Sequence, residues 1–114
     1  MITLDDYRRI ALSLPETEER SHFEQPDFRV KGKIFATMHK DGLTGALKIE
    51  PLAQAALVAA HPDALTPASG AWGRSGWTTV TFAAIDADLA ERLVRDSWRL
   101  VAPKKLAATL PPEG

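Results

Sequence analysis

The chain contains no cysteine. This absence excludes disulfide bonds, thiolate metal ligands and cysteine nucleophiles together, and it fits a reducing compartment. A long apolar run is also missing, because the longest, Ala55 to Ala60, is far too short to span a bilayer. The segment from Met1 to Asp6 is acidic and has no apolar stretch, so we expect no signal peptide, no membrane partner and a cytoplasmic protein.

An excess of charge of either sign is absent as well. The formal net charge is −1 at pH 7, so any nucleic-acid site must be a local patch rather than a property of the whole surface. Apolar residues make up 45% and charged residues 25% of the chain, which is typical of a globular domain. We expect one domain over residues 1–114, with 103–114 forming a partly flexible C-terminal tail.

Common enzyme motifs are incomplete. Gly73-Arg74-Ser75-Gly76 resembles parts of a nucleophile elbow and of a phosphate loop. It lacks the glycine spacing around the serine that a nucleophile elbow needs. It also lacks the longer glycine frame and the following helix of a phosphate loop. His22, His39 and His61 lack the helical spacing of a metal-binding pair. Asp27 is the nearest candidate for an acid–base carboxylate, although a turn or strand-start role is expected for it. We therefore predict no enzyme activity, no catalytic residue, no metal site and no cofactor.

Hydrophobic periodicity predicts an α+β fold. A helix is predicted over residues 3–14, behind a Thr3 N-cap, and Glu16 to Glu19 are predicted to form a solvated connection. Three antiparallel strands are predicted at 28–31, 34–39 and 44–49, then a helix at 51–60, a fourth strand at 77–82 and a last helix ending before Pro103. This order predicts a two-layer sandwich, in which one antiparallel sheet has helices on one face.

Basic residues gather between Phe28 and Ile49, where Asp41 is the one acid. Strand alternation places Arg29 and Lys31 on the open face of the sheet, and Lys48 can project from the same face. This patch could hold phosphates, with a tryptophan as a stacking plane. The alternative is an ordinary polar sheet face with tryptophans that only pack. The candidate nucleic-acid-binding residues are Arg29, Lys31, Lys33, Lys48, Arg74, Trp72 and Trp77.

The order and spacing of several motifs resemble the MmcQ/YjbR family of small bacterial proteins. The motifs are Pro26-Asp27-Phe28-Arg29-Val30, Gly32-Lys33-Ile34-Phe35-Ala36, Ala46-Leu47-Lys48, Gly73-Arg74 with Trp77-Thr78-Thr79-Val80, and Ser97-Trp98. The resemblance covers the chain from the first helix to Lys105. It implies a frataxin-like (CyaY-like) α+β fold, often described as a double-wing DNA-binding module, and it supplies no catalytic residues.

We therefore predict a small non-enzymatic binding module that contacts DNA phosphates through a basic sheet face. The alternative prediction is an adaptor for another protein or a small ligand, with no nucleic-acid role. Binding to phosphates weakens steeply with salt, whereas an adaptor that uses apolar contacts is salt-tolerant. The sequence leaves the oligomeric state open.

Overall fold

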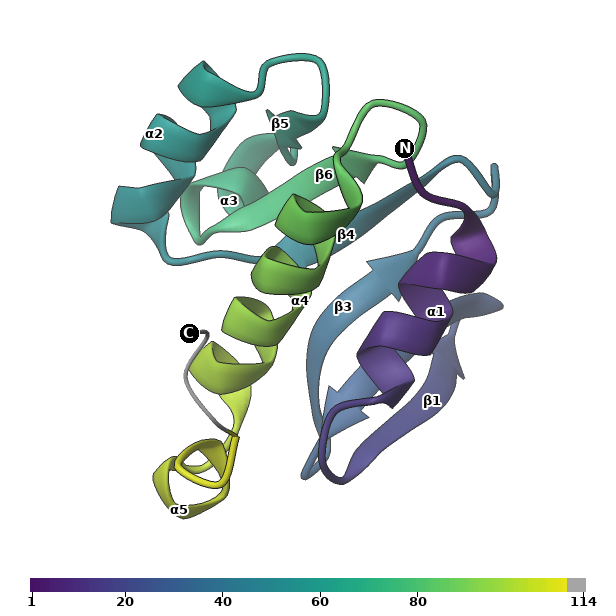
Figure 1. The fold of residues 1–114 in the computed structure, drawn as a ribbon, viewed down its shortest axis with the longest axis vertical. Coiled ribbons are helices and arrows are strands. Elements are labelled where there is room, and N and C mark those ends of the chain that lie inside the picture. The colour runs from purple at the N-terminus through teal and green to yellow at the C-terminus, as the bar shows by residue number, and fades with distance from the viewer. Residues whose placement is uncertain (111–114) are drawn as a thin grey trace.

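The computed structural model describes residues 1–110 as one antiparallel sheet with helices packed against it (Figure 1). The helices are α1 (Leu4–Leu12), α2 (Pro51–Ala60), α3 (Gly70–Arg74), α4 (Ala87–Val101) and α5 (Lys104–Ala107). The strands are β1 (Thr17–His22), β2 (Gln25–Val30), β3 (Lys33–Met38), β4 (Thr44–Lys48), β5 (Leu65–Pro67) and β6 (Trp77–Thr81). The strand order is β1-β2-β3-β4-β6-β5, and every neighbouring pair is antiparallel. The predicted α+β class is confirmed.

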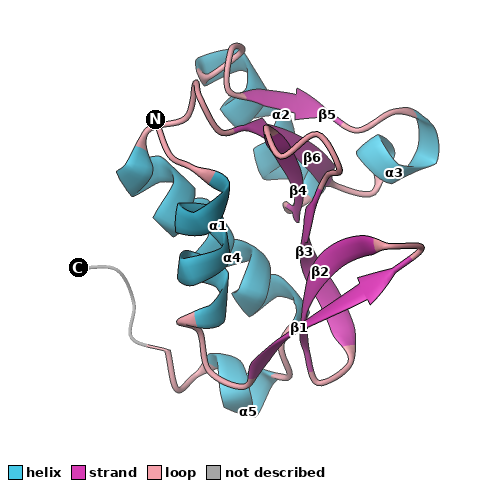
Figure 2. Ribbon diagram, turned by 90° about the vertical axis from the view of Figure 1, so that its right-hand side faces the viewer, coloured by secondary structure: helices cyan, strands magenta, loops and turns pink. Residues whose placement is uncertain are grey.

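Helices α1 and α4 cover one face of the sheet (Figure 2). At the start of α1, Thr3 Oγ1 accepts a hydrogen bond from Asp6 N, and Thr3 N donates to Asp6 Oδ2, which closes the predicted capping box. Trp98 of α4 is fully buried and donates from Nε1 to the carbonyl oxygen of Pro15 at 3.1 Å. The buried stripe of α4 consists of Ala90, Leu93, Val94, Ser97 and Trp98.

The sheet turns its apolar side towards these helices. Phe28 and Val30 of β2 are fully buried, and the register of β2 against β3 shifts directly after Phe28. This β-bulge allows the adjacent residues Phe35 and Ala36 both to be fully buried in the core. The core therefore takes more apolar side chains from β3 than strict alternation would supply.

Two strands escape the sequence prediction. Of residues 16–19, predicted to be a connection, 17–19 form the first half of β1, and β5 lies between the predicted helix at 51–60 and the predicted strand at 77–82. No residue of β1 is buried, so this strand has no alternation of apolar and polar residues to reveal it. Phe23 and Glu24 connect β1 to β2 with φ angles of 49° and 65°, as a two-residue type I′ turn requires. Glycine or asparagine is the usual occupant of such positions, so the sequence gives no sign of this hairpin.

The incomplete glycine motif, Gly73-Arg74-Ser75-Gly76, begins within a short helix, α3. Gly73 lies within it and packs so closely that a Cβ atom would stand 1.9 Å from the carbonyl oxygen of Ala68. Figure 2 shows α3 beside the sheet, on the opposite side from α1 and α4. In the predicted flexible tail, residues 104–107 form α5, and 111–114 lie outside the described residues.

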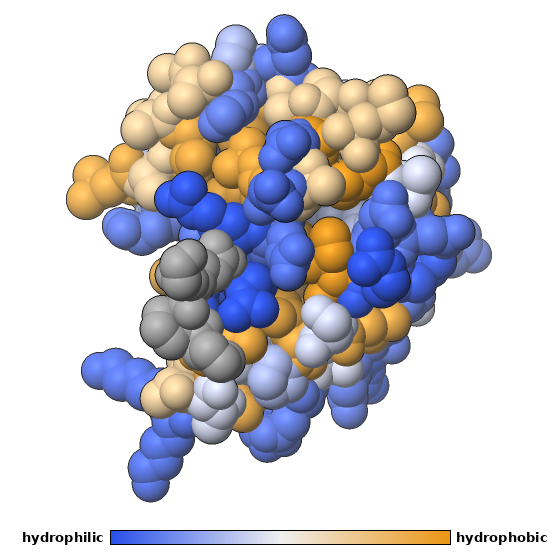
Figure 3. All heavy atoms as spheres, in the orientation of Figure 1, coloured by the Kyte–Doolittle hydropathy of each residue, from blue (hydrophilic) through white to orange (hydrophobic). Residues whose placement is uncertain are grey.

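Helix α2 borders α4 but exposes most of its own surface. None of its residues is buried, and Leu52 is 86% exposed. Figure 3 shows apolar side chains gathered over this helix. Gln54 anchors it to the sheet by donating from Nε2 to Thr78 Oγ1 at 2.9 Å. Apolar as α2 is, no helix in the described part of the chain is long and apolar enough to cross a membrane.

Candidate binding groove on the open sheet face

The face of the sheet away from α1 and α4, here called the open face, carries mostly polar side chains. Among the described helices, only α3 lies beside it (Figure 2). The strand register assigns residues from all six strands to this face. They are Glu18, Arg20 and His22 of β1, Gln25, Asp27 and Arg29 of β2, Ile34 and Thr37 of β3, Thr44, Ala46 and Lys48 of β4, Thr66 of β5, and Trp77, Thr79 and Thr81 of β6.

A groove of about 300 Å³ lies on the open face between the β1–β2 hairpin and α3. This volume is at the lower end of the range for small-ligand sites. The groove has an aromatic end, an apolar floor and an imidazole end. Its lining consists of Trp72, Trp77, Ala68 and Ser69 at the aromatic end, Ile34, Thr37 and Ala46 on the floor, and His22, Gln25 and His39 at the imidazole end.

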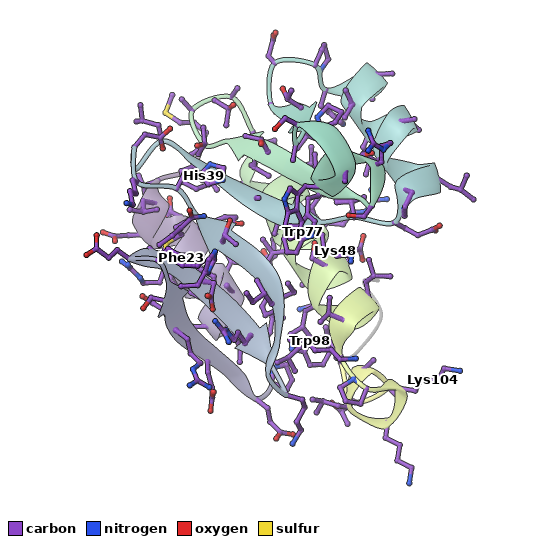
Figure 4. The ribbon with its side chains drawn as sticks, turned by 180° about the vertical axis from the view of Figure 1, so that it is seen from behind. Phe23, His39, Lys48, Trp77, Trp98 and Lys104 are labelled. Atoms are coloured by element: carbon purple, nitrogen blue, oxygen red, sulfur yellow. The ribbon has the colours of Figure 1, made fainter. Side chains whose placement is uncertain are left out.

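The aromatic end combines an exposed and a half-buried tryptophan. Trp72 projects from α3 with 68% of its surface exposed, whereas Trp77 begins β6 and is half-buried. Lys48 is the cross-strand partner of Trp77, and its Nζ lies 5.9 Å from the centroid of the Trp77 ring (Figure 4). This distance allows a cation–π interaction. The aromatic end thus combines two tryptophan rings with a positive charge over one of them.

The imidazole end is organised around Asp27, whose side chain is fully buried. Arg29 binds this carboxylate in a bidentate manner, with Nε 2.8 Å from Oδ1 and Nη2 3.0 Å from Oδ2. His22 Nδ1 lies 2.7 Å from Oδ2. Burial raises the pKa of Asp27, but the hydrogen bonds from Arg29 and His22 outweigh burial and hold the pKa below its usual value. Because an ionised carboxylate only accepts hydrogen bonds, His22 Nδ1 must carry a proton.

The Asp27 cluster should make the fold acid-sensitive. Its folded pKa lies below the unfolded value, so its stabilising contribution is present above the unfolded pKa and is lost as the pH falls through the folded pKa. Urea denaturation at about pH 7 and about pH 2.5 should show a smaller acid-induced loss of unfolding free energy in Asp27→Asn than in the parent, by roughly 1 kcal/mol. Asp63→Asn, in an exposed loop, is the matched control. Equal losses in Asp27→Asn and the parent would contradict this assignment.

Two of the residues predicted to contact phosphate, Arg29 and Lys31, form ion pairs with carboxylates. Arg29 lies on the open face as predicted, but Asp27 neutralises its charge. Lys31, also predicted on this face, lies in the turn after β2, which ends at Val30, and has a φ of 50°. Lys31 Nζ pairs there with Glu16 Oε1 at 2.6 Å. Neither side chain offers a free cation to a ligand in the groove.

The other candidate binding residues are Lys33, Lys48, Arg74, Trp72 and Trp77. Lys48 projects from the open face as predicted, beside Trp77, and Trp72 faces the same groove. Arg74 is exposed at the end of α3 and forms no ion pair with a described residue. Lys33 is exposed at the start of β3 and borders a separate hollow together with Lys48. The structure thus places the two tryptophans at one end of the groove and Lys48 next to one of them, Trp77.

Sequence reasoning gave no binding role to His22, His39 or Asp27. His22 and Asp27 meet because they lie on neighbouring strands across the β1–β2 turn. The available signal was the alternation of Arg20 and His22 on one side of the turn and of Asp27 and Arg29 on the other. That signal is informative only once residues 17–22 are known to form a strand.

The observations define an α+β domain with one helix-covered and one open sheet face. The family model described as YjbR matches residues 12–100, and the chain belongs to the YjbR family. It is similar to the crystal structure of Deinococcus radiodurans protein DR2400, a DUF419 domain, with 31% sequence identity and a TM-score of 0.78 over 89% of this chain and 79% of that chain. No curated protein matches the chain significantly. The resemblance identified from the sequence motifs is confirmed.

Proposed function

We propose that this YjbR-family domain is a nucleic-acid-binding module that contacts DNA through its open face. The observation that carries the proposal is the position of Lys48 Nζ, 5.9 Å from the centroid of Trp77, a ring that lines the groove together with the exposed Trp72. Bases of any sequence stack on aromatic rings, and lysine contacts phosphates as a point charge. The exposed Phe23, at the tip of the β1–β2 hairpin, adds a second aromatic group bordering the open face (Figure 4).

The phosphate contacts in this proposal differ from those expected from the sequence. Arg29 and Lys31 are paired with carboxylates, whereas Lys48, Arg74 and Arg20 form no ion pair with any described residue. Three phosphate contacts would lower the affinity by roughly 20- to 40-fold when salt rises from about 50 to about 200 mM, because each contact releases condensed counterions.

Reversing the charge of Lys48 tests the proposal. Lys48→Glu should weaken binding of a labelled oligonucleotide by at least about tenfold and reduce the salt dependence by roughly one contact, as measured by fluorescence anisotropy. Lys104→Glu makes the same charge change on α5, far from the open face (Figure 4), and should leave the affinity unchanged. If Lys48→Glu binds DNA like the parent, the open face is not the site.

The same titration tests the adaptor alternative. Ile34 and Ala46 give the groove an apolar floor, which would suit a small ligand or an apolar side chain of another protein. Such binding would persist at high salt and would not respond to Lys48→Glu.

The proposed function contains no catalytic step and no cofactor. Ser75, the serine of the incomplete glycine motif, donates from Oγ to the carbonyl oxygen of Trp72 at 2.9 Å. This hydrogen bond directs its proton to the backbone of α3, which supports a structural role. We place the module in the cytoplasm, where a cysteine-free DNA-binding chain would meet its ligand.

A further inference from the structure

Two histidines of the groove present the same ring nitrogen to a ligand. His22 donates from Nδ1 to Asp27, so Nε2 is its remaining nitrogen. His39 Nδ1 lies 2.7 Å from Thr44 Oγ1, and that hydroxyl donates its own proton to the Asp41 carboxylate at 3.0 Å. Thr44 must therefore accept from His39 Nδ1, which again leaves Nε2. Neither Nε2 has a partner among the described residues, and both histidines line the groove.

Histidine is the side-chain type whose charge ordinarily changes near neutral pH, and two histidines line the groove. The charged side chains around them come from α1, β1, β2 and the two adjoining turns, and are Arg8, Arg20, Glu24, Asp27, Arg29, Lys40 and Asp41. Carboxylate, guanidinium and ammonium side chains keep their charge between about pH 5 and pH 8, whereas histidine side chains gain a proton in that range. A proton taken up by either imidazole would therefore add positive charge at this end of the groove.

We propose that the groove binds one unpaired nucleotide unit, with the base against Trp72 and Trp77 and the phosphate against Nε2 of His22 and His39, so that binding tightens as the pH falls. A protonated imidazole donates a charge-assisted hydrogen bond to phosphate, and the aromatic end supplies the stacking surface for the base. This inference rests on the proposed nucleic-acid function, although a free mononucleotide carries the same chemistry.

The size of the groove favours an unpaired base over a duplex. Its volume of about 300 Å³ admits one small ligand. In a duplex the faces of the bases are stacked on one another, whereas in a single strand they can turn out onto aromatic side chains. The groove therefore selects single-stranded over double-stranded DNA.

The test is a pair of titrations of the intact chain with labelled oligo(dT) and with a duplex of the same length, at pH 8 and at pH 6. Neither thymine nor a phosphodiester changes charge between these values, so any effect of pH arises in the protein. The affinity for oligo(dT) should exceed that for the duplex and should rise roughly tenfold on acidification. His22→Gln and His39→Gln should each reduce this rise, and His61→Gln, at the exposed end of α2, should retain it.

Each outcome separates this inference from the proposed function. DNA binding without pH dependence, or with full pH dependence in both groove variants, overturns the inference and leaves the function standing. Preference for the duplex does the same. Binding of dTMP that both groove variants weaken, without oligo(dT) binding, supports the nucleotide groove and overturns the DNA function. Binding of neither ligand overturns both. Because the pH comparison uses the unaltered chain, it does not depend on whether a variant folds.

Discussion

Replacing Trp98 with alanine should lower the free energy of unfolding by about 3–5 kcal/mol, because it removes the largest fully buried side chain and leaves a cavity. The change also removes the hydrogen bond from Nε1 to the carbonyl oxygen of Pro15, which ties α4 to the segment after α1. That carbonyl would then lose its partner inside the protein. Urea denaturation followed by far-UV circular dichroism measures the loss.

Trp72→Ala is the matched control for this prediction. It is the same chemical change at a side chain that is 68% exposed, so the free energy of unfolding should change by no more than about 0.5 kcal/mol. On the proposed function, Trp72→Ala should instead weaken DNA binding. A loss of stability in Trp72→Ala as large as in Trp98→Ala would show that the two tryptophans do not divide into a core and a surface role.

Replacing Gly76 with alanine should destabilise the fold by roughly 2–6 kcal/mol, through backbone strain and overpacking together. Gly76 has a φ of 110°, and a Cβ atom there would stand 1.9 Å from the carbonyl oxygen of Ile49. The two residues are held together because Ile49 N donates to the Gly76 carbonyl oxygen at 2.9 Å. The added carbon would push apart the end of β4 and the start of β6.

Gly42→Ala separates strain from overpacking. Gly42 also has a positive φ, 71°, but nothing lies within 4 Å of a Cβ placed on it. Its replacement should cost only about 1 kcal/mol, the conformational penalty alone. Thermal or urea denaturation of both variants gives the comparison, and equal losses would mean that the contact between Gly76 and Ile49 has no energetic weight.

The glycines around Arg74 therefore have a packing role that sequence reasoning missed. Gly73 and Gly76 belong to the glycine motif that the sequence analysis found incomplete for an enzyme, and each is required by a close backbone approach, to Ala68 and to Ile49 respectively. Such close approaches join segments that are far apart in the sequence or that lack regular secondary structure. A local sequence pattern therefore does not predict them.

The parts of the fold that sequence predicts are those with a local cause. The capping box at Thr3 and the apolar stripe that buries Trp98 depend on spacing within one helix, and both are present.

The candidate site depended on contacts that no local pattern reports. Lys48 and Trp77 were both named from the sequence, but their pairing across β4 and β6 was not. The pairing of His22 with Asp27 requires the β1–β2 hairpin, whose turn lacks the usual glycine or asparagine. Sequence reasoning therefore found the aromatic end of the groove and missed the imidazole end.

Strand β1 also limits how copies of this chain can associate. It ends the strand order, so its outer backbone N–H and C=O groups could extend the sheet into a neighbouring molecule. Its residues Glu18, Glu19 and Arg20 are charged and exposed. If the β1 strands of two copies of the chain paired edge to edge, like charges would lie opposite or beside one another, which is unfavourable. The same composition that hides β1 from sequence-based prediction therefore protects the exposed sheet edge against aggregation.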